Sequence, residues 1–180
     1  AAFNAMINAC ARAGDVPRAE GAFSEMVAAG IAPDAISYSS LLKACAVAGD
    51  VNCAERIWNE MHQRTNHFHT FTPPTSHAYA HLMAVNRRAG APERVLGLLA
   101  EMRATGLAPT TVHYSLALHA CEQHADLPNA LARALALYDE MQGAGLRLDS
   151  RGLLALGRLA NLHGRPDLAR RLRRERSQRA

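Results

Sequence analysis

Residues 2–34 read AFNAMINACARAGDVPRAEGAFSEMVAAGIAPD, and the pattern of this segment recurs along the 180-residue chain about every 35 residues. Four classes of residue keep one register. They are the aromatics Phe3, Tyr38, Tyr79 and Tyr114, the cysteines Cys10, Cys45 and Cys121, the glycines Gly14, Gly49, Gly90 and Gly164, and the pairs Glu25-Met26, Glu60-Met61, Glu101-Met102 and Glu140-Met141. Because unrelated residue classes share the same spacing, the chain is a tandem repeat.

The repeats differ in length, and the extra residues can be localised. The distance from Met to the following Pro is longer in the second repeat, which predicts a six-residue insertion within 63–73. The distance from Ala125 to Met141 is longer than its counterparts, which predicts a four-residue insertion near 129–136. We therefore divide the chain into repeats at 1–34, 35–75, 76–110 and 111–149, followed at 150–180 by a degenerate repeat with an Arg-rich C-terminal cap.

Each repeat is expected to form two helices. In the second repeat, residues 37–47 and 52–63 each carry apolar residues at helical spacing, and Gly49-Asp50 separates the two segments. The 36 alanines and the aromatic content of only 5% favour helices over a β-sandwich. A single helical hairpin cannot bury both of its faces, but stacked copies can. The sequence therefore predicts an all-α solenoid of helix-turn-helix repeats.

The charge is unevenly distributed. Residues 1–164 carry 13 Arg or Lys against 14 Asp or Glu, whereas residues 165–180 carry 7 Arg against Asp167 and Glu175. Attraction of phosphate is therefore not a property of the bulk of the chain. No apolar run approaches the ~18 residues of a membrane span, so we expect no membrane insertion. The chain starts at Ala1 without a leader, which we interpret as a fragment or a mature form.

The segments 2–10, 13–16, 22–26 and 30–34 resemble the pentatricopeptide repeat almost residue for residue. The resemblance covers essentially the whole chain, with four clear repeats and a degenerate fifth. Tetratricopeptide repeats are the most similar alternative, but their Trp-Leu-Gly-Tyr signature is absent from the first helix here. The resemblance implies a right-handed superhelix that binds single-stranded RNA in a mitochondrion or plastid, at about one base per repeat.

The first helix of each repeat is expected to line the concave groove. Positions i, i+4 and i+7 share one helix face, and this face is small or polar in all four clear repeats. Its residues are Asn4, Asn8 and Ala11, then Ser39, Lys43 and Ala46, then Ala80, Ala84 and Arg87, then Ser115, His119 and Glu122. We therefore predict an open, hydrated face.

The resemblance implies that the fifth and last residues of a repeat select the base and that the second residue is an apolar wedge between bases. The selecting pairs would be Asn4 with Asp34, Ser39 with Thr75, Ala80 with Thr110, and Ser115 with Asp149. Asn with Asp resembles a uracil-preferring pair and Ser with Asp a guanine-preferring pair. Ala80 has no hydrogen-bonding side chain, so the third repeat should be nearly silent.

Wedges and cations complete the expected interface. Ile36 and Val112 fit the wedge pattern, whereas Ala1, His77 and Arg151 depart from it. The groove cations are few: Arg12, Lys43, Arg87 and Arg88. The C-terminal arginines are Arg170, Arg171, Arg173, Arg174, Arg176 and Arg179, and we expect them to point outward from a capping helix or an arm. That surface is either simply solvated or contacts RNA phosphate or an acidic protein.

We expect no catalytic residue, cofactor or metal. Cys10, Cys45 and Cys121 occupy one register and are predicted to be small buried core residues. The histidines near the first insertion, His62, His67, His69, His77 and His81, match no familiar zinc spacing. The deaminase and nuclease signatures found beside some such repeats are absent from these residues.

Two functions follow from these patterns. The first is a noncatalytic, sequence-selective RNA-binding protein that acts in RNA processing, stability or translation. The second is a scaffold within a larger organellar complex, such as a ribosome, that holds protein subunits or structured RNA. We expect no DNA partner in either case. The neutral body favours the scaffold, whereas the Asn4-Asp34 and Ser115-Asp149 pairs favour the RNA reader.

Overall fold

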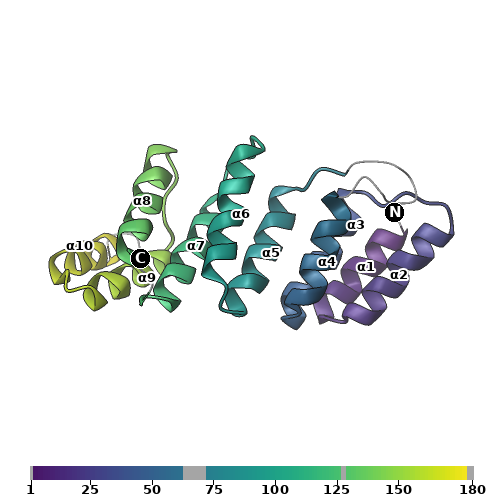
Figure 1. Ribbon diagram of the computed structural model, residues 1–180, viewed down its shortest axis with the longest axis horizontal. Helices are drawn as coiled ribbons and strands as arrows, with labels where there is room; N and C mark the ends of the chain where they lie inside the picture. Colours follow the sequence, from purple (N-terminus) through teal and green to yellow (C-terminus); the bar gives the residue numbers. More distant parts are fainter. Residues whose placement is uncertain (1, 63–71, 127–128, 178–180) are drawn as a thin grey trace. The chain divides into compact units, whose positions relative to one another are not determined.

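The computed structural model describes residues 2–62, 72–126 and 129–177 (Figure 1). Within these ranges the secondary structure consists of ten α-helices and no strand, which confirms the all-α solenoid. None of these helices combines the length and apolar character that a membrane crossing needs. The helices group into two compact units, residues 1–89 and 90–180, and the boundary falls between the two helices of the third predicted repeat.

Unit 1 (residues 1–89) contains five helices. They are α1 (Ala2–Ala13), α2 (Val16–Ala28), α3 (Ala35–Ala48), α4 (Val51–His62) and α5 (Ser76–Arg88). The first helices pack in a row, α1 on α3 and α3 on α5, while α2 and α4 lie against this row (Figure 1). The hairpin predicted in the second repeat is therefore present as α3 and α4. Gln63 lies outside the described residues.

Unit 2 (residues 90–180) contains the other five helices. They are α6 (Pro92–Ala104), α7 (Thr111–Gln123), α8 (Ala130–Gly143), α9 (Ser150–Leu162) and α10 (Pro166–Ser177). The first helices α7 and α9 pack on each other, with α8 against both and α6 against α7. The Arg-rich segment is a helix rather than a loose arm, because α10 packs on α9 and buries Ala169 and Leu172.

The recurring aromatic and glutamate residues are hydrogen-bonded partners. The hydroxyl of Tyr114 on α7 donates to Glu140 Oε1 on α8 at 2.8 Å, and the hydroxyl of Tyr38 on α3 lies 3.5 Å from Glu60 Oε1 on α4. Each bond joins the first helix of a hairpin to the second. The shared register of these two residue types therefore reflects a repeated contact that sets the hairpin angle.

Glycines shape the turns between paired helices. Gly49 ends α3 in the left-handed region, at φ 79°, which only glycine adopts without a steric cost. Gly14 has φ 69°, and a Cβ at that position would lie 2.9 Å from Cγ1 of Val47. A side chain at residue 14 would therefore push α3 away from the end of α1.

The insertion in the fourth repeat lies closer to the N-terminus than predicted. Residues 124–129 join α7 to α8, whereas only Gly49 and Asp50 join α3 to α4. The ends of these helices therefore place the extra length ahead of α8, at the start of the predicted range 129–136. The insertion of the second repeat falls largely on 63–71, outside the described residues.

The cysteines are mostly core residues, with one exception. Cys45 and Cys121 are buried as predicted, but Cys10 is only half-buried, because α1 lies at the edge of the helix row in unit 1. Burial raises the pKa of the Cys121 thiol. Cys53 is also buried, and its Sγ lies 3.5 Å from Glu20 Oε1.

Candidate nucleic-acid interface

The last residue of each predicted repeat stands at the start of the next first helix. These residues are the N-caps of α3, α5, α7 and α9, namely Asp34, Thr75, Thr110 and Asp149, all with extended backbone. A capping side chain turns back toward the first free N–H groups of its helix. Within their own units, Asp34, Thr75 and Asp149 therefore each stabilise one helix and lie beside the preceding first helix.

In unit 1 the structure brings the first selecting pair together. Asn4 Nδ2 on α1 donates to both carboxylate oxygens of Asp34, at 3.1 Å and 3.2 Å. Asp34 Oδ1 also accepts the backbone N–H groups of Ile36 at 3.0 Å and Ser37 at 2.8 Å. The amide of Asn4 is therefore held in one orientation, with the second hydrogen of its Nδ2 still available to a ligand.

The buried hydroxyl of Ser37 lies beneath this pair. Ser37 Oγ is 2.7 Å from Asn4 Oδ1 and 2.9 Å from Asp34 Oδ1, and its single proton serves one of them at a time. Burial alone would raise the pKa of Asp34, but hydrogen bonds from Ser37, Asn4 and the N–H of Ile36 outweigh it and lower the pKa. Asp34 is therefore a carboxylate near neutral pH.

In unit 2 the two members of the fourth selecting pair are also hydrogen-bonded to each other. Ser115 Oγ on α7 donates to Asp149 Oδ1 at 3.2 Å, and the same oxygen accepts the N–H of Gly152 at 2.8 Å. One turn further along α7, His119 Nδ1 lies 2.7 Å from the carbonyl of Ser115. Because a carbonyl only accepts, Nδ1 carries the proton, and in the neutral ring Nε2 is an acceptor.

The second selecting pair lies in a groove between α3 and α5. Ser39 and Thr75 both line it, and Thr75 Oγ1 accepts the N–H of Ala78 at 3.2 Å. The other lining residues are Asn8, Ala35, Ile36, Ser40, Lys43, His77 and His81. Burial, together with Lys43 and His77, lowers the pKa of His81 to about 4, so its ring is neutral at pH 7.

The two members of the third pair belong to different units. Ala80 is half-buried on α5 in unit 1, while Thr110 caps α7 in unit 2, and its Oγ1 lies 2.9 Å from Nδ1 of His113. The N–H of Thr110 also donates to that nitrogen at 3.0 Å, so His113 completes a capping box with a ring in place of a carboxylate.

The wedge positions that match the expected pattern are highly exposed for apolar residues. Ile36 is 62% exposed and Val112 is 56% exposed, each at the start of a first helix beside a capping residue. His77 and Arg151 are also exposed at equivalent places. Ala1 lies outside the described residues.

The open face is shorter than predicted in the first two repeats, whereas Arg87 and Glu122 at the third position of the other two are half-buried. The first two residues of each stripe are half-buried, but Ala11 and Ala46 at the third position are buried. Neighbouring first helices pack closely at that level, and alanine permits the close approach. Lys43 Nζ donates to Asn8 Oδ1 at 3.2 Å, so the stripes of α1 and α3 are linked on the open part of the face.

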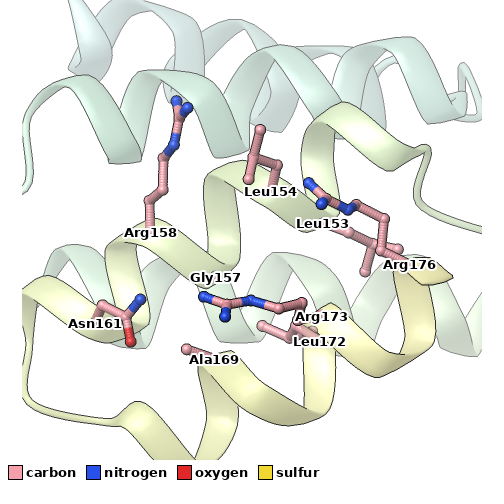
Figure 2. Close-up of a pocket in the computed structure, with 9 residues that line it drawn as sticks. All are labelled: Leu153, Leu154, Gly157, Arg158, Asn161, Ala169, Leu172, Arg173 and Arg176. Carbon is pink, nitrogen blue, oxygen red and sulfur yellow. The ribbon is translucent and has the colours of Figure 1, made fainter.

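The cations are distributed unevenly. Arg12 is exposed at the end of α1, Arg87 is half-buried, and the guanidinium of Arg88 donates to the carbonyl of Ala46. On α10 the exposed arginines are Arg170, Arg171, Arg173 and Arg174, and Arg176 is half-buried. The exposed Arg173 and the half-buried Arg176 line a surface pocket between α10 and α9 (Figure 2). Arg179 lies outside the described residues.

Among residues 2–62, 72–126 and 129–177, no cluster of three or more His, Cys, Asp or Glu side chains is arranged to hold a metal ion. His62 Nδ1 lies 2.8 Å from the carbonyl of Trp58, and its ring contacts the indole at 4.6 Å between centroids with an interplanar angle of 48°. His67 and His69 lie outside the described residues.

Sequence reasoning missed Ser37, which contacts both members of the first pair. The signal was available, because Asp34 and Ser37 have the spacing of a capping box, in which the third helical residue returns a hydrogen bond to the N-cap. Here Ser37 Oγ accepts the N–H of Asp34 at 3.2 Å. We expected the pair to act alone, and the structure adds this third residue.

Family models for the pentatricopeptide repeat match three parts of the chain. A model of the PPR repeat family matches residues 1–47, a PPR repeat model matches 36–65, and a pentatricopeptide repeat domain model matches 75–123. Pentatricopeptide repeat-containing protein 10, chloroplastic, from Zea mays is 39% identical over 72 residues. The match covers 40% of this chain and 9% of that protein, so the chain spans a small part of this relative.

Solved structures share the fold. Maize PPR10 in complex with an 18-nucleotide psaJ RNA element has a TM-score of 0.74 at 24% identity, over 99% of this chain and 25% of that one. The PPR domain of Arabidopsis thaliana protein-only RNase P 1, in complex with tRNA, has a TM-score of 0.77 at 18% identity. That match covers 96% of this chain and 86% of the other. At these identities the likeness concerns the fold.

Proposed function

The chain belongs to the pentatricopeptide repeat family, and from this premise we propose that it binds single-stranded RNA selectively and without catalysis, in RNA processing, stability or translation. The proposal rests on one observation. Asn4 with Asp34 and Ser115 with Asp149 are each joined by side-chain hydrogen bonds, and the exposed apolar residues Ile36 and Val112 lie close in sequence to Asp34 and Ser115. A base stacked on such a residue would present its edge to the pair.

We propose that the first pair prefers uracil and the fourth prefers guanine, with the repeats divided at 1–34, 35–75, 76–110 and 111–149. At one base per repeat, two less selective bases separate the uracil from the guanine. The groove of Ser39 and Thr75, with Lys43 beside it, would take the second base. Ala80 offers the third base no polar side chain.

The place of action is a plastid or a mitochondrion. The chloroplastic relative supports the plastid. The RNA named with maize PPR10 and the tRNA named with the Arabidopsis protein support an RNA ligand for this chain. Neither relative identifies which transcript it would be.

Binding of the whole chain to a randomised single-stranded RNA pool tests the proposal. We expect enrichment of a uracil and a guanine separated by two intervening bases, and a loss of binding in the double variant Asn4→Ala with Ser115→Ala. Each lost base contact is worth roughly 1–3 kcal/mol by analogy with other base readers. The matched control is Asn59→Ala with Ser24→Ala, which removes the same side chains from exposed positions on α4 and α2.

One combination of results would contradict the assigned base-selecting pairs. If the double variant binds RNA as tightly as the native protein while removal of residues 165–180 abolishes binding, charge holds the RNA and the assigned pairs are wrong. The salt dependence distinguishes these cases, because affinity that depends on phosphate contacts alone falls steeply with salt.

The scaffold remains a second candidate because residues 1–164 carry no excess positive charge. In that case the protein would co-sediment with a large organellar complex, such as a ribosome, after nuclease removes single-stranded RNA. Release by the same treatment would support the RNA reader instead.

A further inference from the structure

Lys43 is the only lysine among the 20 Lys and Arg residues of the sequence, and it lies half-buried in the groove between α3 and α5. Its Nζ donates to Oδ1 of Asn8 at 3.2 Å, so a neutral amide holds the ammonium group. Arg103, by contrast, pairs with the carboxylate of Glu140 at 2.7 Å. Within the part of the chain that the structure describes, no carboxylate forms an ion pair with Lys43. Its charge is therefore available to a ligand in the groove.

The groove offers mainly hydrogen-bond donors. An ammonium group has three protons, and Asn8 accepts one of those of Lys43. Oγ1 of Thr75 accepts the N–H of Ala78, which leaves its own proton to donate. Among the described residues that line the groove, none is Asp or Glu. The groove therefore suits a ligand whose edge is rich in acceptors.

Two exposed side chains of the groove suit a flat ring. Ile36, at the start of α3, is 62% exposed, and His77, at the start of α5, is exposed as well. An imidazole ring or an apolar surface is a platform on which a base stacks. Ser39 and Thr75, the second selecting pair, line the same groove, so a base stacked there would turn its edge toward them.

Lys43 lies one helical turn beyond Ser39 on α3. Four residues of a helix span about 6 Å, so the two side chains line successive levels of the groove. A purine, with two rings, spans these levels more fully than a pyrimidine does. Guanine has the acceptors O6 and N7 side by side, and lysine donates to both. Adenine has an amino group in place of O6, and this donor opposes the ammonium group of a lysine.

We propose that Lys43 makes guanine the preferred second base by donating to its O6 and N7, with Asn8 as the positioning residue of the ammonium group. This preference depends on the proposed RNA-binding function and extends it. The hydroxyl groups of Ser39 and Thr75 both donate and accept, so alone they leave the choice between guanine and adenine open. Phosphate is the less suitable ligand, since Lys43 is half-buried in the groove of the selecting pair, whereas Arg12 is exposed outside it.

The test uses the whole chain and synthetic RNAs that differ at one base. Uracil and guanine are kept at the first and fourth positions, in the strand direction found with the randomised pool, and the second base is guanine, adenine, uracil or cytosine. We expect guanine to bind about fivefold more tightly than adenine, at the lower end of base discrimination, because Lys43 also serves Asn8. Hypoxanthine, which keeps O6 and N7, should bind as guanine does, and 7-deazaguanine, which lacks N7, should bind about threefold more weakly.

Variants of the protein assign the preference to the lysine. Lys43→Met keeps a long side chain that suits a helix but removes the charge and the donors, so guanine and adenine should bind within about twofold of each other. Asn8→Ala frees the ammonium group and should reduce the preference without abolishing it. The matched control Arg12→Met removes an exposed cation outside the groove, and should leave the preference unchanged. A preference is a ratio measured on one protein, so it does not depend on the fraction of a variant that is folded.

Different results would overturn different claims. If none of these RNAs binds saturably, the proposed function fails and the guanine preference fails with it. If RNA binds but Lys43→Met lowers the affinity equally for all four second bases and reduces the salt dependence, Lys43 contacts phosphate and the preference alone fails. A guanine preference that persists in Lys43→Met would assign it to Ser39 and Thr75, and would also overturn the role of the lysine.

Discussion

The Asn4-Asp34 pair in unit 1 and the Ser115-Asp149 pair in unit 2 occupy the same register but are built differently. In unit 1 the third residue of α3 is Ser37, and its hydroxyl reaches both members of the pair. In unit 2 the third residue of α9 is Gly152, and a Cβ there would lie 2.4 Å from Leu148 Cδ1. Leu148 thus excludes a side chain at the place that Ser37 takes.

The difference shows how one repeat pattern yields sites of unequal rigidity. Asp34 receives hydrogen bonds from Asn4, Ile36 and Ser37, so its carboxylate is largely committed to positioning Asn4. Asp149 receives them from Ser115 and Gly152. We infer that the first pair is preorganised by the protein and that the fourth depends more on its ligand for its final geometry.

Removal of the two carboxylates should give the largest difference between the pairs. We expect Asp34→Ala to lower the free energy of unfolding by about 2 kcal/mol and Asp149→Ala by about 1 kcal/mol, because both lose an N-cap but Asp34 also loses the network. Hydrogen exchange measured by mass spectrometry would assign each loss to its unit. Asp34→Asn is the control that keeps a capping oxygen. Equal losses for Asp34→Ala and Asp149→Ala would remove the distinction between the pairs.

Acid should weaken unit 1 through His81. Its pKa is lowered to about 4 by burial, Lys43 and His77, whereas an unfolded histidine titrates near pH ~6.5. Between these values the unfolded chain binds a proton that the folded chain does not, so stability falls as the pH drops through this window, by roughly 1 kcal/mol after allowance for solvent screening. Hydrogen exchange of α3 and α5 at pH 7 and pH 4.5 measures the loss. His81→Gln should flatten this dependence, and an unchanged slope would show that His81 is not the group responsible.

A smaller effect is expected from Ser37→Ala. This change removes the hydroxyl beneath the first pair but leaves Asp34 capping α3 through backbone N–H groups, so the free energy of unfolding should fall by only about 0.5–1 kcal/mol. Preference for uracil at the first base should weaken more than total affinity does. Competition binding with uracil and cytosine oligonucleotides checks this, and Ser24→Ala at an exposed position on α2 is the control. If the preference for uracil is retained, the hydrogen bond from Ser37 to Asn4 is not needed for base selection.

The repeat period was sufficient to predict the fold. Tyr38 and Tyr114 and the glutamates that follow them marked two of the hairpins, because each of these tyrosines hydrogen-bonds to its glutamate on the paired helix. Gly49 correctly marked a turn, since its left-handed backbone excludes most other residues. Local requirements of this kind restrict the residue type at one position and can therefore be predicted from the sequence.

Features that depend on packing between helices were harder to predict. The burial of Ala11 and Ala46 follows from the close approach of neighbouring first helices, and polarity patterns do not reveal that distance. The contact of Ser37 with Asn4 was not predicted, because it depends on how closely α1 packs beside the start of α3.

Asp34, Thr75, Thr110 and Asp149 are helix N-caps, and if they also select bases as we propose, the two roles together restrict which residues these positions can accept. Only Asp, Asn, Ser, Thr and Gly terminate a helix well at this end, so any residue chosen for its contact with a base must also come from that short set. Redesign of target preference within the set should leave the thermal midpoint nearly unchanged, while a larger or aliphatic replacement would unravel the first turn of the next repeat. Helix initiation thus limits the residue types that these positions can use for recognition.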